Sequence, residues 1–249
     1  MSEAGLGPLI GSGKDAEVFV CGAHVAKLYR SPAAKRSAFR EGAVLAVVHS
    51  LGMPVPAVHA VRAFDERWAV VMDRAVGVPF TEAMLSDRSC LPAFLTAMVA
   101  LHRRIHEKPG RHLPSLRARL AGNFSAVEVQ LGARRRNRLT EVLAELPGDD
   151  RLCHGDFHPW NIIGDIGNET VVDWLDAASG PPAADVCRSW LLIASQEPGI
   201  ADAYVDAYCA AAGLARTAVL AWLPVTAAAR LAENVPEEAD RLIALADEV

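Results

Sequence analysis

The stretch that decides the fold is His154-Gly155-Asp156-Phe157-His158-Pro159-Trp160-Asn161. The apolar pair Ile162-Ile163 follows, then Gly164-Asp165, and a few residues later the run Val171-Val172-Asp173-Trp174. Glycine and aspartate between two apolar runs are typical of a hairpin turn. The pattern therefore predicts a polar loop, a β-hairpin, and an acidic side chain at the end of the second strand.

A loop of the form H-x-D-x-x-x-x-N, followed by a hairpin and an apolar strand ending in Asp, resembles the catalytic loop and metal-binding Asp of protein kinases. The glycine after the histidine, and Asp-Trp in place of Asp-Phe-Gly, resemble the aminoglycoside phosphotransferase and choline kinase branch in particular. The resemblance spans roughly Leu9 to Leu192. It implies an ATP-dependent enzyme that moves the γ-phosphoryl group to a hydroxyl of a small molecule, with GTP as an alternative donor.

The resemblance also implies a role for each polar residue. Asp156 would be the catalytic residue that accepts or orients the proton of the acceptor hydroxyl, and Asn161 and Asp173 would hold Mg²⁺. Oxygen ligands of this kind suit magnesium rather than zinc. A loop that is merely rich in capping residues is the weaker interpretation, because four residues match at the spacing of the family. Zinc ligation by Cys153, His154 and His158 lacks the spacing and the second ligand pair of a zinc module.

The first thirty residues predict three antiparallel strands. The strands are expected at Leu9-Ile10, Glu17–Val20 and His24–Tyr29, with a loop over residues 11–15 between the first two. Backbone N–H groups of Gly11, Ser12 and Gly13 in that loop could cover the phosphates of a nucleotide. A G-x-G turn alone is weak support, since most such turns are simple hairpins.

Lys27 lies in the middle of the third expected strand and is similar to the kinase lysine that binds the α- and β-phosphates. A helix is predicted from Ser31-Pro32 to about Leu51, since Ser is a good N-cap and Pro suits the first turn. Glu41 on this helix stands where a kinase has the glutamate that pairs with that lysine. Glu17, at the edge of the second strand, is the alternative partner, and an exposed helical Glu41 is the plain alternative.

Two more strands are expected at Val58–Val61 and Trp68–Met72, and the residues that follow, through Gly77, resemble a kinase hinge. Main-chain groups near Asp73 and Ala75 would then bind adenine. The resemblance thus implies an α+β, protein-kinase-like, two-lobed fold. A small antiparallel sheet with one main helix would form an N-terminal nucleotide-binding lobe (residues 1–73). A hinge (74–77) would join it to a larger, mainly helical catalytic and substrate-binding lobe (78–249).

Helical spacing of apolar residues predicts a helix over Leu91–His106 and a second over about Val127–Leu146. Short strands with loops are expected from Arg151 to Asp176, and Ala-rich helix from Ala183 to the end. Asp185, after the Gly180-Pro181 turn, is expected to be structural, as an N-cap or as a brace for the catalytic loop. His154 is likewise expected to brace the loop rather than act as an acid or base.

Composition excludes several classes of protein. The net charge of −5 argues against a general nucleic-acid binder, which needs a basic surface. No apolar run approaches the roughly 20 residues of a membrane span, and residues 1–5 lack the features of a signal peptide, so a cytoplasmic protein without a membrane partner is expected. Five scattered cysteines suggest neither a disulfide framework nor a zinc module.

Charge is unevenly distributed along the chain. From Gln196 onward there are nine acidic and three basic residues. This segment could steer a cationic acceptor toward the site, although solvated helix faces explain the charge equally well. The run Arg134–Arg138 is expected to be the solvated face of a helix.

The identity of the acceptor stays open at this point. Protein kinases place Lys and Arg where this chain has His158 and Gly155, which argues against a protein substrate. The acceptor could be an aminoglycoside or another antibiotic, or a metabolite such as an amino alcohol or a sugar. A nucleotide-binding pseudokinase with a regulatory role is the alternative from another class. The oligomeric state is likewise open.

Overall fold

The computed structural model describes residues 5–248, which form two compact units. The first unit contains the described residues through Ser86 together with Trp160–Leu175. The second contains Asp87–Pro159 and the described residues from Asp176 onward. Residues 1–4, within the segment judged above to lack a signal peptide, lie outside the described part. The lobe boundaries expected at residues 73 and 78 stay a prediction.

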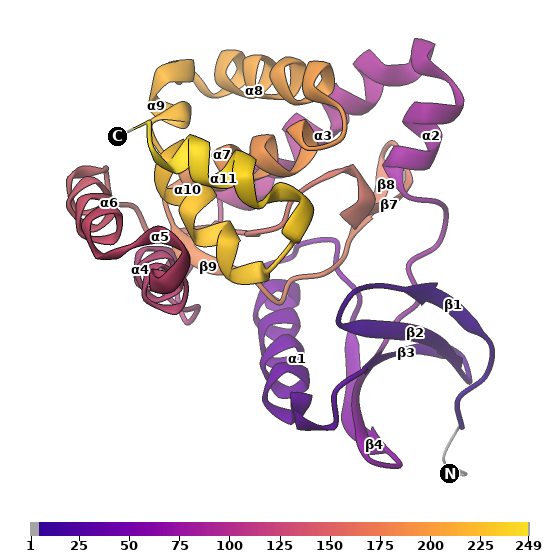
Figure 1. The fold of residues 1–249 in the computed structure, drawn as a ribbon. Coiled ribbons are helices and arrows are strands. Elements are labelled where there is room, and N and C mark those ends of the chain that lie inside the picture. The colour runs from indigo at the N-terminus through magenta and orange to yellow at the C-terminus, as the bar shows by residue number, and fades with distance from the viewer. Residues whose placement is uncertain (1–4, 249) are drawn as a thin grey trace. The chain divides into compact units, whose positions relative to one another are not determined.

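A five-stranded antiparallel sheet with the order β1-β2-β3-β5-β4 dominates the first unit (Figure 1). The strands are β1 (Leu9–Ser12), β2 (Ala16–Cys21), β3 (His24–Tyr29), β4 (Val58–Phe64) and β5 (Arg67–Met72). The expected glycine-rich loop is shorter than predicted, because Gly11 and Ser12 pair with Val18 and Glu17 as part of β1. Backbone pairing with β2 therefore extends β1 through Gly11.

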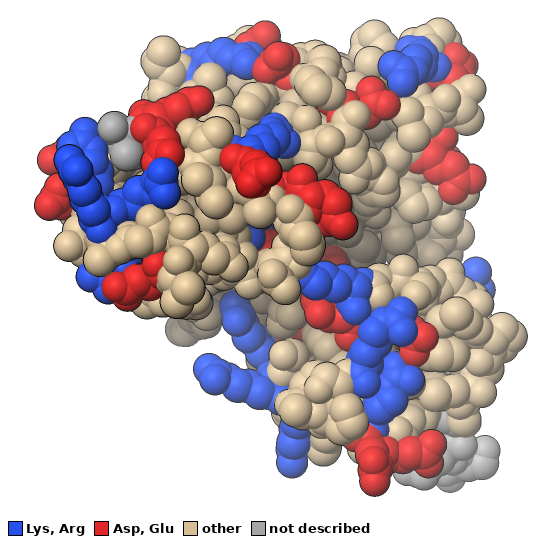
Figure 2. Space-filling view, in the orientation of Figure 1, with Lys and Arg blue, Asp and Glu red and all other residues tan. Residues whose placement is uncertain are grey.

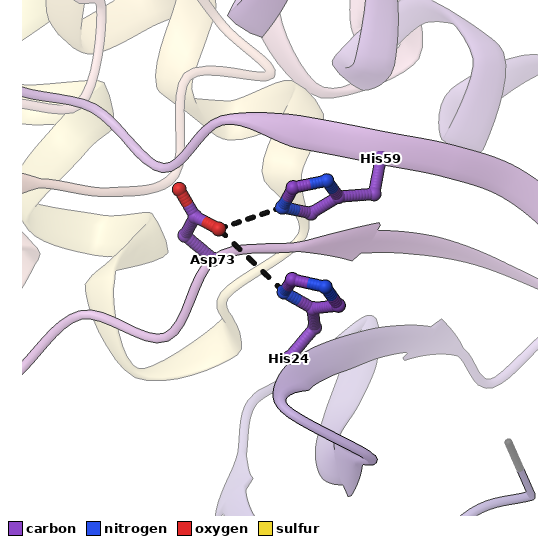
Figure 3. Close-up of side chains that lie close together, drawn as sticks. All are labelled: His24, His59 and Asp73. Atoms are coloured by element: carbon purple, nitrogen blue, oxygen red, sulfur yellow. Dashed lines mark hydrogen bonds and ion pairs between the residues drawn. The ribbon is translucent and has the colours of Figure 1, made fainter.

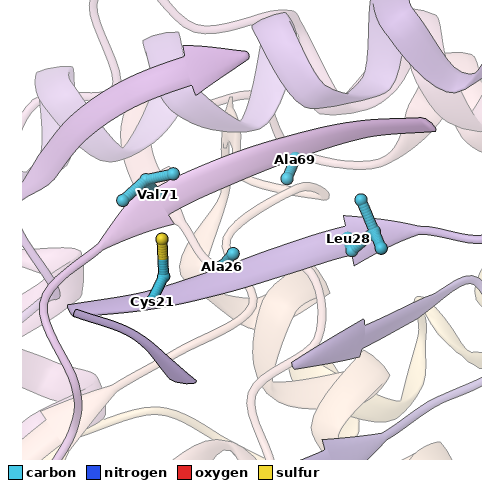
Figure 4. Packing of buried hydrophobic residues seen from close by; sticks show 5 residues of the cluster. All are labelled: Cys21, Ala26, Leu28, Ala69 and Val71. Atoms are coloured by element: carbon cyan, nitrogen blue, oxygen red, sulfur yellow. The ribbon is translucent and has the colours of Figure 1, made fainter. Parts of the chain in front are cut away.

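Alternation along β3 gives the sheet two different faces. Ala26 and Leu28 are buried with Ala69 and Val71 of β5 in an apolar cluster that also includes Cys21 (Figure 4). The side chain of Lys27 points to the opposite face, since successive residues of a strand alternate between faces. Burial of Ala26 and Leu28 on the apolar face fixes the register of β3 in the sheet. The same register places Lys27 on the opposite face.

The remaining elements of the first unit are two α-helices, a 3₁₀ turn and a β-hairpin. Helix α1 (Lys35–Ser50) packs against β4 and β5 and follows a 3₁₀ turn, η1 (Pro32–Ala34), that Ser31 caps through its hydroxyl. The hairpin of β7 (Ile162–Asp165) and β8 (Asn168–Val171) and the short helix α2 (Phe80–Ser86) also belong to this unit. The predicted helix and hairpin are thus present close to their expected positions.

The second unit is mainly helical, with one two-stranded sheet of β6 (Arg151–Cys153) and β9 (Ala178–Gly180). Its α-helices are α3 (Leu91–His106), α4 (Leu116–Ala126), α5 (Glu128–Leu131), α6 (Ala133–Glu145), α7 (Pro182–Ala194), α8 (Pro198–Ala212), α9 (Arg216–Leu220), α10 (Leu223–Arg230) and α11 (Ala239–Ala246). Single 3₁₀ turns lie at η2 (Arg88–Cys90), η4 (Leu231–Glu233) and η5 (Pro236–Glu238), and η3 (Pro159–Asn161) spans the boundary of the two units.

Two predicted helices are interrupted in the structure. The helix expected over residues 127–146 breaks at Gly132, whose φ of 77° lies in a region that L-residues avoid. The Ala-rich segment after Ala183 divides into five α-helices (Figure 1), with Gly213 in the left-handed conformation ending α8.

The α+β class is confirmed, with a five-stranded antiparallel sheet and helix followed by a mainly helical region. Within residues 5–248, no single helix is long and apolar enough to cross a membrane, although two bent pairs of helices reach that length and composition together.

Candidate active site

A cavity of about 390 Å³ opens in the first unit, and every residue that lines it belongs to that unit. Apolar side chains from the sheet and α1 form much of its wall, among them Val25, Leu45 and Met72. Seven of the residues singled out in the sequence also line it: Gly11, Lys27, Glu41, Asp73, Ala75, Asn161 and Asp173. An apolar cavity with a few convergent polar groups is the usual form of a small-molecule site.

Lys27 connects two carboxylates in this cavity. Its ammonium group donates to Glu41 Oε1 at 2.7 Å and to Asp173 Oδ1 at 2.8 Å. Glu41 is only 1% exposed and also accepts a hydrogen bond from the Tyr29 hydroxyl at 2.5 Å. Glu17, the alternative partner for Lys27, accepts hydrogen bonds from Arg30 and Arg67 instead.

The charges of this group are fixed by their surroundings. Burial alone would lower the pKa of Lys27, but the carboxylates of Glu41 and Asp173 outweigh it and raise that pKa above its ordinary value. Burial and the Glu41 carboxylate raise the pKa of the Tyr29 hydroxyl, which therefore remains a hydrogen-bond donor. The result is a permanent cation at the wall of the cavity.

Asp173 adopts an unusual backbone conformation, with φ at 63°. A non-glycine residue in this region is uncommon and concentrates at functional sites. The hairpin of β7 and β8 carries both Asn161 and Asp173, since the Val172 N–H donates to the Asn161 carbonyl at 2.9 Å across its base. One amide and one carboxylate thus flank the same cavity as oxygen donors.

Ser12 and Gly13 are not among the residues that line the cavity. The Ser12 hydroxyl accepts a hydrogen bond from Arg30 at 2.7 Å, and the Gly13 carbonyl accepts one from the same guanidinium at 3.1 Å. Of the predicted phosphate loop, only Gly11 borders the cavity.

Asp156 belongs to the second unit, where a chain of charged groups surrounds it. His158 Nε2 lies 3.3 Å from Asp156 Oδ2, and Arg188 Nη2 lies 3.5 Å from Oδ1. Arg188 also binds Glu233 at 2.5 Å, and Glu233 in turn binds Arg230 at 2.8 Å. Burial would raise the pKa of the Asp156 carboxyl, but the hydrogen bond and charge of His158 and the charge of Arg188 outweigh it and lower that pKa.

Asp185 supports the loop that carries Asp156. Its carboxylate accepts the backbone N–H of His154 at 2.6 Å and that of Gly155 at 2.7 Å. His102 and His106 of α3 donate to the same carboxylate, at 3.0 and 3.1 Å. Asp185 thus braces the loop rather than lining a ligand cavity, as expected.

The loop itself needs glycine at position 155. Gly155 has a φ of 82°, and a side chain there would collide with the carbonyl of Asp176. The Asp156 N–H donates to His154 Nδ1 at 3.1 Å, so His154 braces the loop as well.

Four residues that sequence reasoning passed over have a place in these clusters. Tyr29 binds Glu41, Arg188 binds the Asp156 loop, and His102 and His106 hold Asp185. Arg188 stands three residues after Asp185 on the same helix, which could have identified it. The two histidines are separated from Asp185 by some eighty residues and gave no local signal.

Charged residues outside these clusters pair with one another. On α6, Arg135 binds Asp247 at 2.7 Å and Arg136 binds Glu128 at 2.7 Å. Figure 2 shows basic and acidic side chains intermixed at the left of the view, where Figure 1 places α6. In the acidic C-terminal segment, Glu238 binds Arg230 at 2.8 Å. Arg134 and Arg138 are exposed, so the arginine run lies on a solvated helix face, as expected, and Arg135 and Arg136 in it are also charge-paired.

Solved structures with a similar fold include aminoglycoside phosphotransferases. A thermostable mutant of aminoglycoside phosphotransferase APH(4)-Ia, in complex with ADP and hygromycin B, superimposes with a TM-score of 0.73 at 16% identity, covering 99% of this chain and 93% of that one. APH(3'')-Id from Streptomyces rimosus, with ADP and streptomycin, gives 0.63 at 19% identity, covering 86% and 94%. An aminoglycoside-3'-phosphotransferase of type VIII gives 0.63 at 19% identity, covering 93% and 92%.

At such identities these likenesses show the kinase-like fold and no more. No curated protein matches the chain in sequence. The model of one protein family does match, over residues 8–223, which is most of the chain. The match includes the sheet, the hairpin and the loop that holds Asp156. The chain therefore belongs to the phosphotransferase enzyme family.

Proposed function

We propose that this phosphotransferase moves the γ-phosphoryl group of ATP to a hydroxyl of a small molecule. The observation that carries the proposal is the ion triad of Lys27, Glu41 and Asp173 at the wall of a cavity that Asn161 also lines. Phosphoryl transfer requires little covalent chemistry from the protein and depends mainly on positioning and charge stabilisation. A fixed cation and oxygen donors around a nucleotide-sized cavity can provide both. GTP is the alternative donor.

Within this proposal the first unit binds the nucleotide. Lys27 contacts the α- and β-phosphates, and Glu41 holds the lysine in position. The backbone at Gly11 covers the phosphates from β1. The main chain at Asp73 and Ala75, which lines the same cavity, binds adenine. Ser12 and Gly13 do not line this cavity, and their contact with the phosphates stays a prediction.

The donors fit a magnesium ion. Asn161 and Asp173 present an amide oxygen and a carboxylate to the cavity, and Mg²⁺ prefers oxygen ligands and phosphate oxygens over nitrogen or sulfur. The ion, when bound, neutralises charge on the phosphates. Asp173 and Asn161 are the residues that would hold it, and Lys27 fixes the orientation of the Asp173 carboxylate through the 2.8 Å bond.

Asp156 serves the acceptor. A new bond forms between the acceptor oxygen and the γ-phosphorus, the bond to the β-phosphate oxygen breaks, and ADP leaves. Asp156 orients the hydroxyl and takes its proton. The lowered pKa of this carboxyl keeps it ionised, which favours orientation of the hydroxyl before transfer over strong basicity. Arg188 and His158 position the carboxylate from either side.

The acceptor we propose is an aminoglycoside or a related amino-containing alcohol. Family membership and the shared fold support a small hydroxylated acceptor. A metabolite such as a sugar or an amino alcohol is the second choice. The acidic C-terminal segment is weak support for a cationic acceptor, because Glu233 and Glu238 are paired with Arg230.

An acceptor screen tests the reaction. ADP release from ATP, and separately from GTP, is measured with magnesium in the presence of aminoglycosides, amino alcohols and sugars. Release that depends on one acceptor class is the expected result. A protein that binds nucleotide but releases no ADP with any acceptor would be a pseudokinase, and the proposal would be wrong.

Three variants separate the proposed roles. Asp156→Asn should lower the rate by about 10²–10⁴-fold with nucleotide binding largely intact, because it removes the carboxylate that orients the acceptor hydroxyl and takes its proton. Asp173→Ala should weaken magnesium-dependent nucleotide binding as well as turnover, and Lys27→Ala should weaken nucleotide binding. Glu141→Gln, on the exposed face of α6, is the control for substitution itself. If Asp156→Asn loses nucleotide binding as completely as Asp173→Ala, the assignment of Asp156 is wrong.

A further inference from the structure

Two histidines and an aspartate meet at one end of the five-stranded sheet (Figure 3). His24 begins β3, His59 is the second residue of β4, and Asp73 directly follows β5. Because Val25 pairs with Met72 across the antiparallel β3 and β5, the neighbouring positions 24 and 73 also lie opposite each other. The sheet register itself therefore brings His24 to Asp73.

An irregularity in β4 adds the second histidine. The pairing of β4 with β5 shifts between Val58 and Ala60, so His59 is the extra residue of a bulge. Bulges redirect a side chain, and they are common beside functional sites. The Asp73 N–H donates to the Ala57 carbonyl at 2.9 Å, which fixes the aspartate next to this bulge.

The three side chains converge on one point. His59 Nε2 lies 2.6 Å and His24 Nδ1 lies 3.6 Å from the same oxygen, Asp73 Oδ1. The two rings stack with centroids 3.8 Å apart, and one ligand atom from each residue falls within 4.8 Å of the others. Zinc bonds of about 2.0–2.2 Å in tetrahedral geometry place neighbouring ligand atoms roughly 3.3 Å apart, so only small side-chain movements are needed.

The cluster is also open to solvent. The side chains of His24, His59 and Asp73 are 37%, 39% and 51% exposed. An ion can therefore reach them without rearrangement of the fold, and water can fill the remaining coordination positions.

A second cluster of the same residue types shows what a purely structural arrangement looks like. His102, His106 and Asp185 are buried, and all four ring nitrogens are hydrogen-bonded, two to Asp185 and two to the hydroxyls of Tyr204 and Tyr208. Asp185 also accepts two backbone N–H groups. In that cluster the ring nitrogens and both carboxylate oxygens already have hydrogen-bond partners within the protein, and all three residues are buried.

We propose that His24, His59 and Asp73 form a binding site for a divalent transition metal ion, for which Zn²⁺ is the probe. Imidazole nitrogen favours zinc and its neighbours over magnesium, so this site differs in chemistry from the oxygen donors Asn161 and Asp173. The proposal does not depend on the proposed kinase activity.

A bound ion at this place would join the ends of three strands. Asp73, together with Arg74 and Ala75, lines the cavity described above. Zinc would thus hold the segment after β5 against β3 and β4, and the first unit would gain stability from the ion because binding occurs only in the folded state.

Zinc titration of the full-length protein, freed of metal with EDTA and measured by calorimetry without nucleotide, tests the site. We expect one zinc ion per chain. The double variant His24→Gln/His59→Gln should weaken that binding by more than about tenfold, since even loss of an outer-shell partner reduces metal affinity by 10–100-fold. His49→Gln, an exposed histidine on α1 of the same unit, is the matched control and should bind as the wild type.

Thermal unfolding provides a second measurement. Zinc should raise the unfolding midpoint of the wild type and of His49→Gln but not that of the double variant. If the double variant does not fold in the absence of metal, His24→Gln alone replaces it. Equal zinc affinity in the wild type and in the variants at His24 and His59, absence of zinc binding by the wild type, or equal binding of magnesium would each overturn the proposal.

Discussion

Glu41 in the first unit and Asp185 in the second are both 1% exposed, but they are stabilised in different ways. Glu41 binds a cation, Lys27, and the hydroxyl of Tyr29. Asp185 binds two backbone N–H groups and two histidines. Burial and the charge of neighbouring His106 lower the pKa of His102 to about 3, so this histidine is neutral at physiological pH.

The difference in binding partners distinguishes a candidate ligand site, around Glu41, from a structural cluster, around Asp185. The partner of Glu41, Lys27, carries a positive charge at the wall of a cavity. The donors to Asp185 are used up within the protein and leave nothing for a ligand. A buried carboxylate is therefore informative about function chiefly through its partners, and variants of those partners distinguish the two arrangements.

Removal of the Asp185 carboxylate should have the largest effect on stability. Asp185→Ala leaves two backbone N–H groups and two imidazoles without their acceptor, and loss of one partner from a buried charged group typically lowers the free energy of unfolding by about 3–5 kcal/mol. Urea denaturation followed by circular dichroism measures the loss. Asp240→Ala, at an exposed position on α11, is the control. Similar losses in the two variants would mean that Asp185 is not the brace described here.

Acid should weaken the Asp185 cluster through His102. Because the folded pKa of His102, about 3, lies below the ordinary value of 6.5, the unfolded chain binds the proton more readily. The stabilisation is complete above pH 6.5 and is lost as pH falls toward 3, at about 1.4 kcal/mol per pH unit. Between pH 6.5 and 5 this amounts to about 2 kcal/mol.

His102→Gln can still donate to Asp185 but cannot take up the proton. Urea denaturation at a series of pH values gives the slope of the unfolding free energy against pH for the wild type and for His102→Gln. Because slopes are compared, a lower overall stability of the variant does not affect the result. Stability of the variant should fall less steeply than that of the wild type between pH 6.5 and 5. Parallel slopes would show that His102 is not buried in its neutral form.

Two tyrosine variants give the smallest and most direct comparison. Tyr29→Phe removes a hydrogen bond to charged Glu41, and Tyr208→Phe removes one to His106 at 2.6 Å. Hydrogen bonds to charged groups contribute about 1.5–3 kcal/mol and neutral ones about 0.5–1.5 kcal/mol. Thermal and urea unfolding should therefore rank Tyr29→Phe as the more destabilising change, and the reverse order would contradict the contrast between the clusters.

Much of the site followed from local patterns. Alternation in β3 determined that Lys27 faces away from Ala26 and Leu28, and the loop-hairpin pattern placed Asn161 and Asp173 at the two ends of one hairpin. The helix Leu91–His106 has the bounds expected from its apolar spacing. Such features depend on neighbours within a few residues, so the sequence alone determines them.

Tertiary structure decided which of the distant groups meet. Nothing near Asp185 in the sequence indicates that α3, some eighty residues earlier, supplies two imidazoles to it, and nothing near His59 indicates a bulge that turns it toward Asp73. The Ser12 hydroxyl and the Gly13 carbonyl both bind Arg30, a contact that the local sequence did not indicate. Packing of whole elements brings these groups together, because the free energy that aligns two helices or strands is spread over many apolar contacts and is not carried by the polar residues that meet as a result.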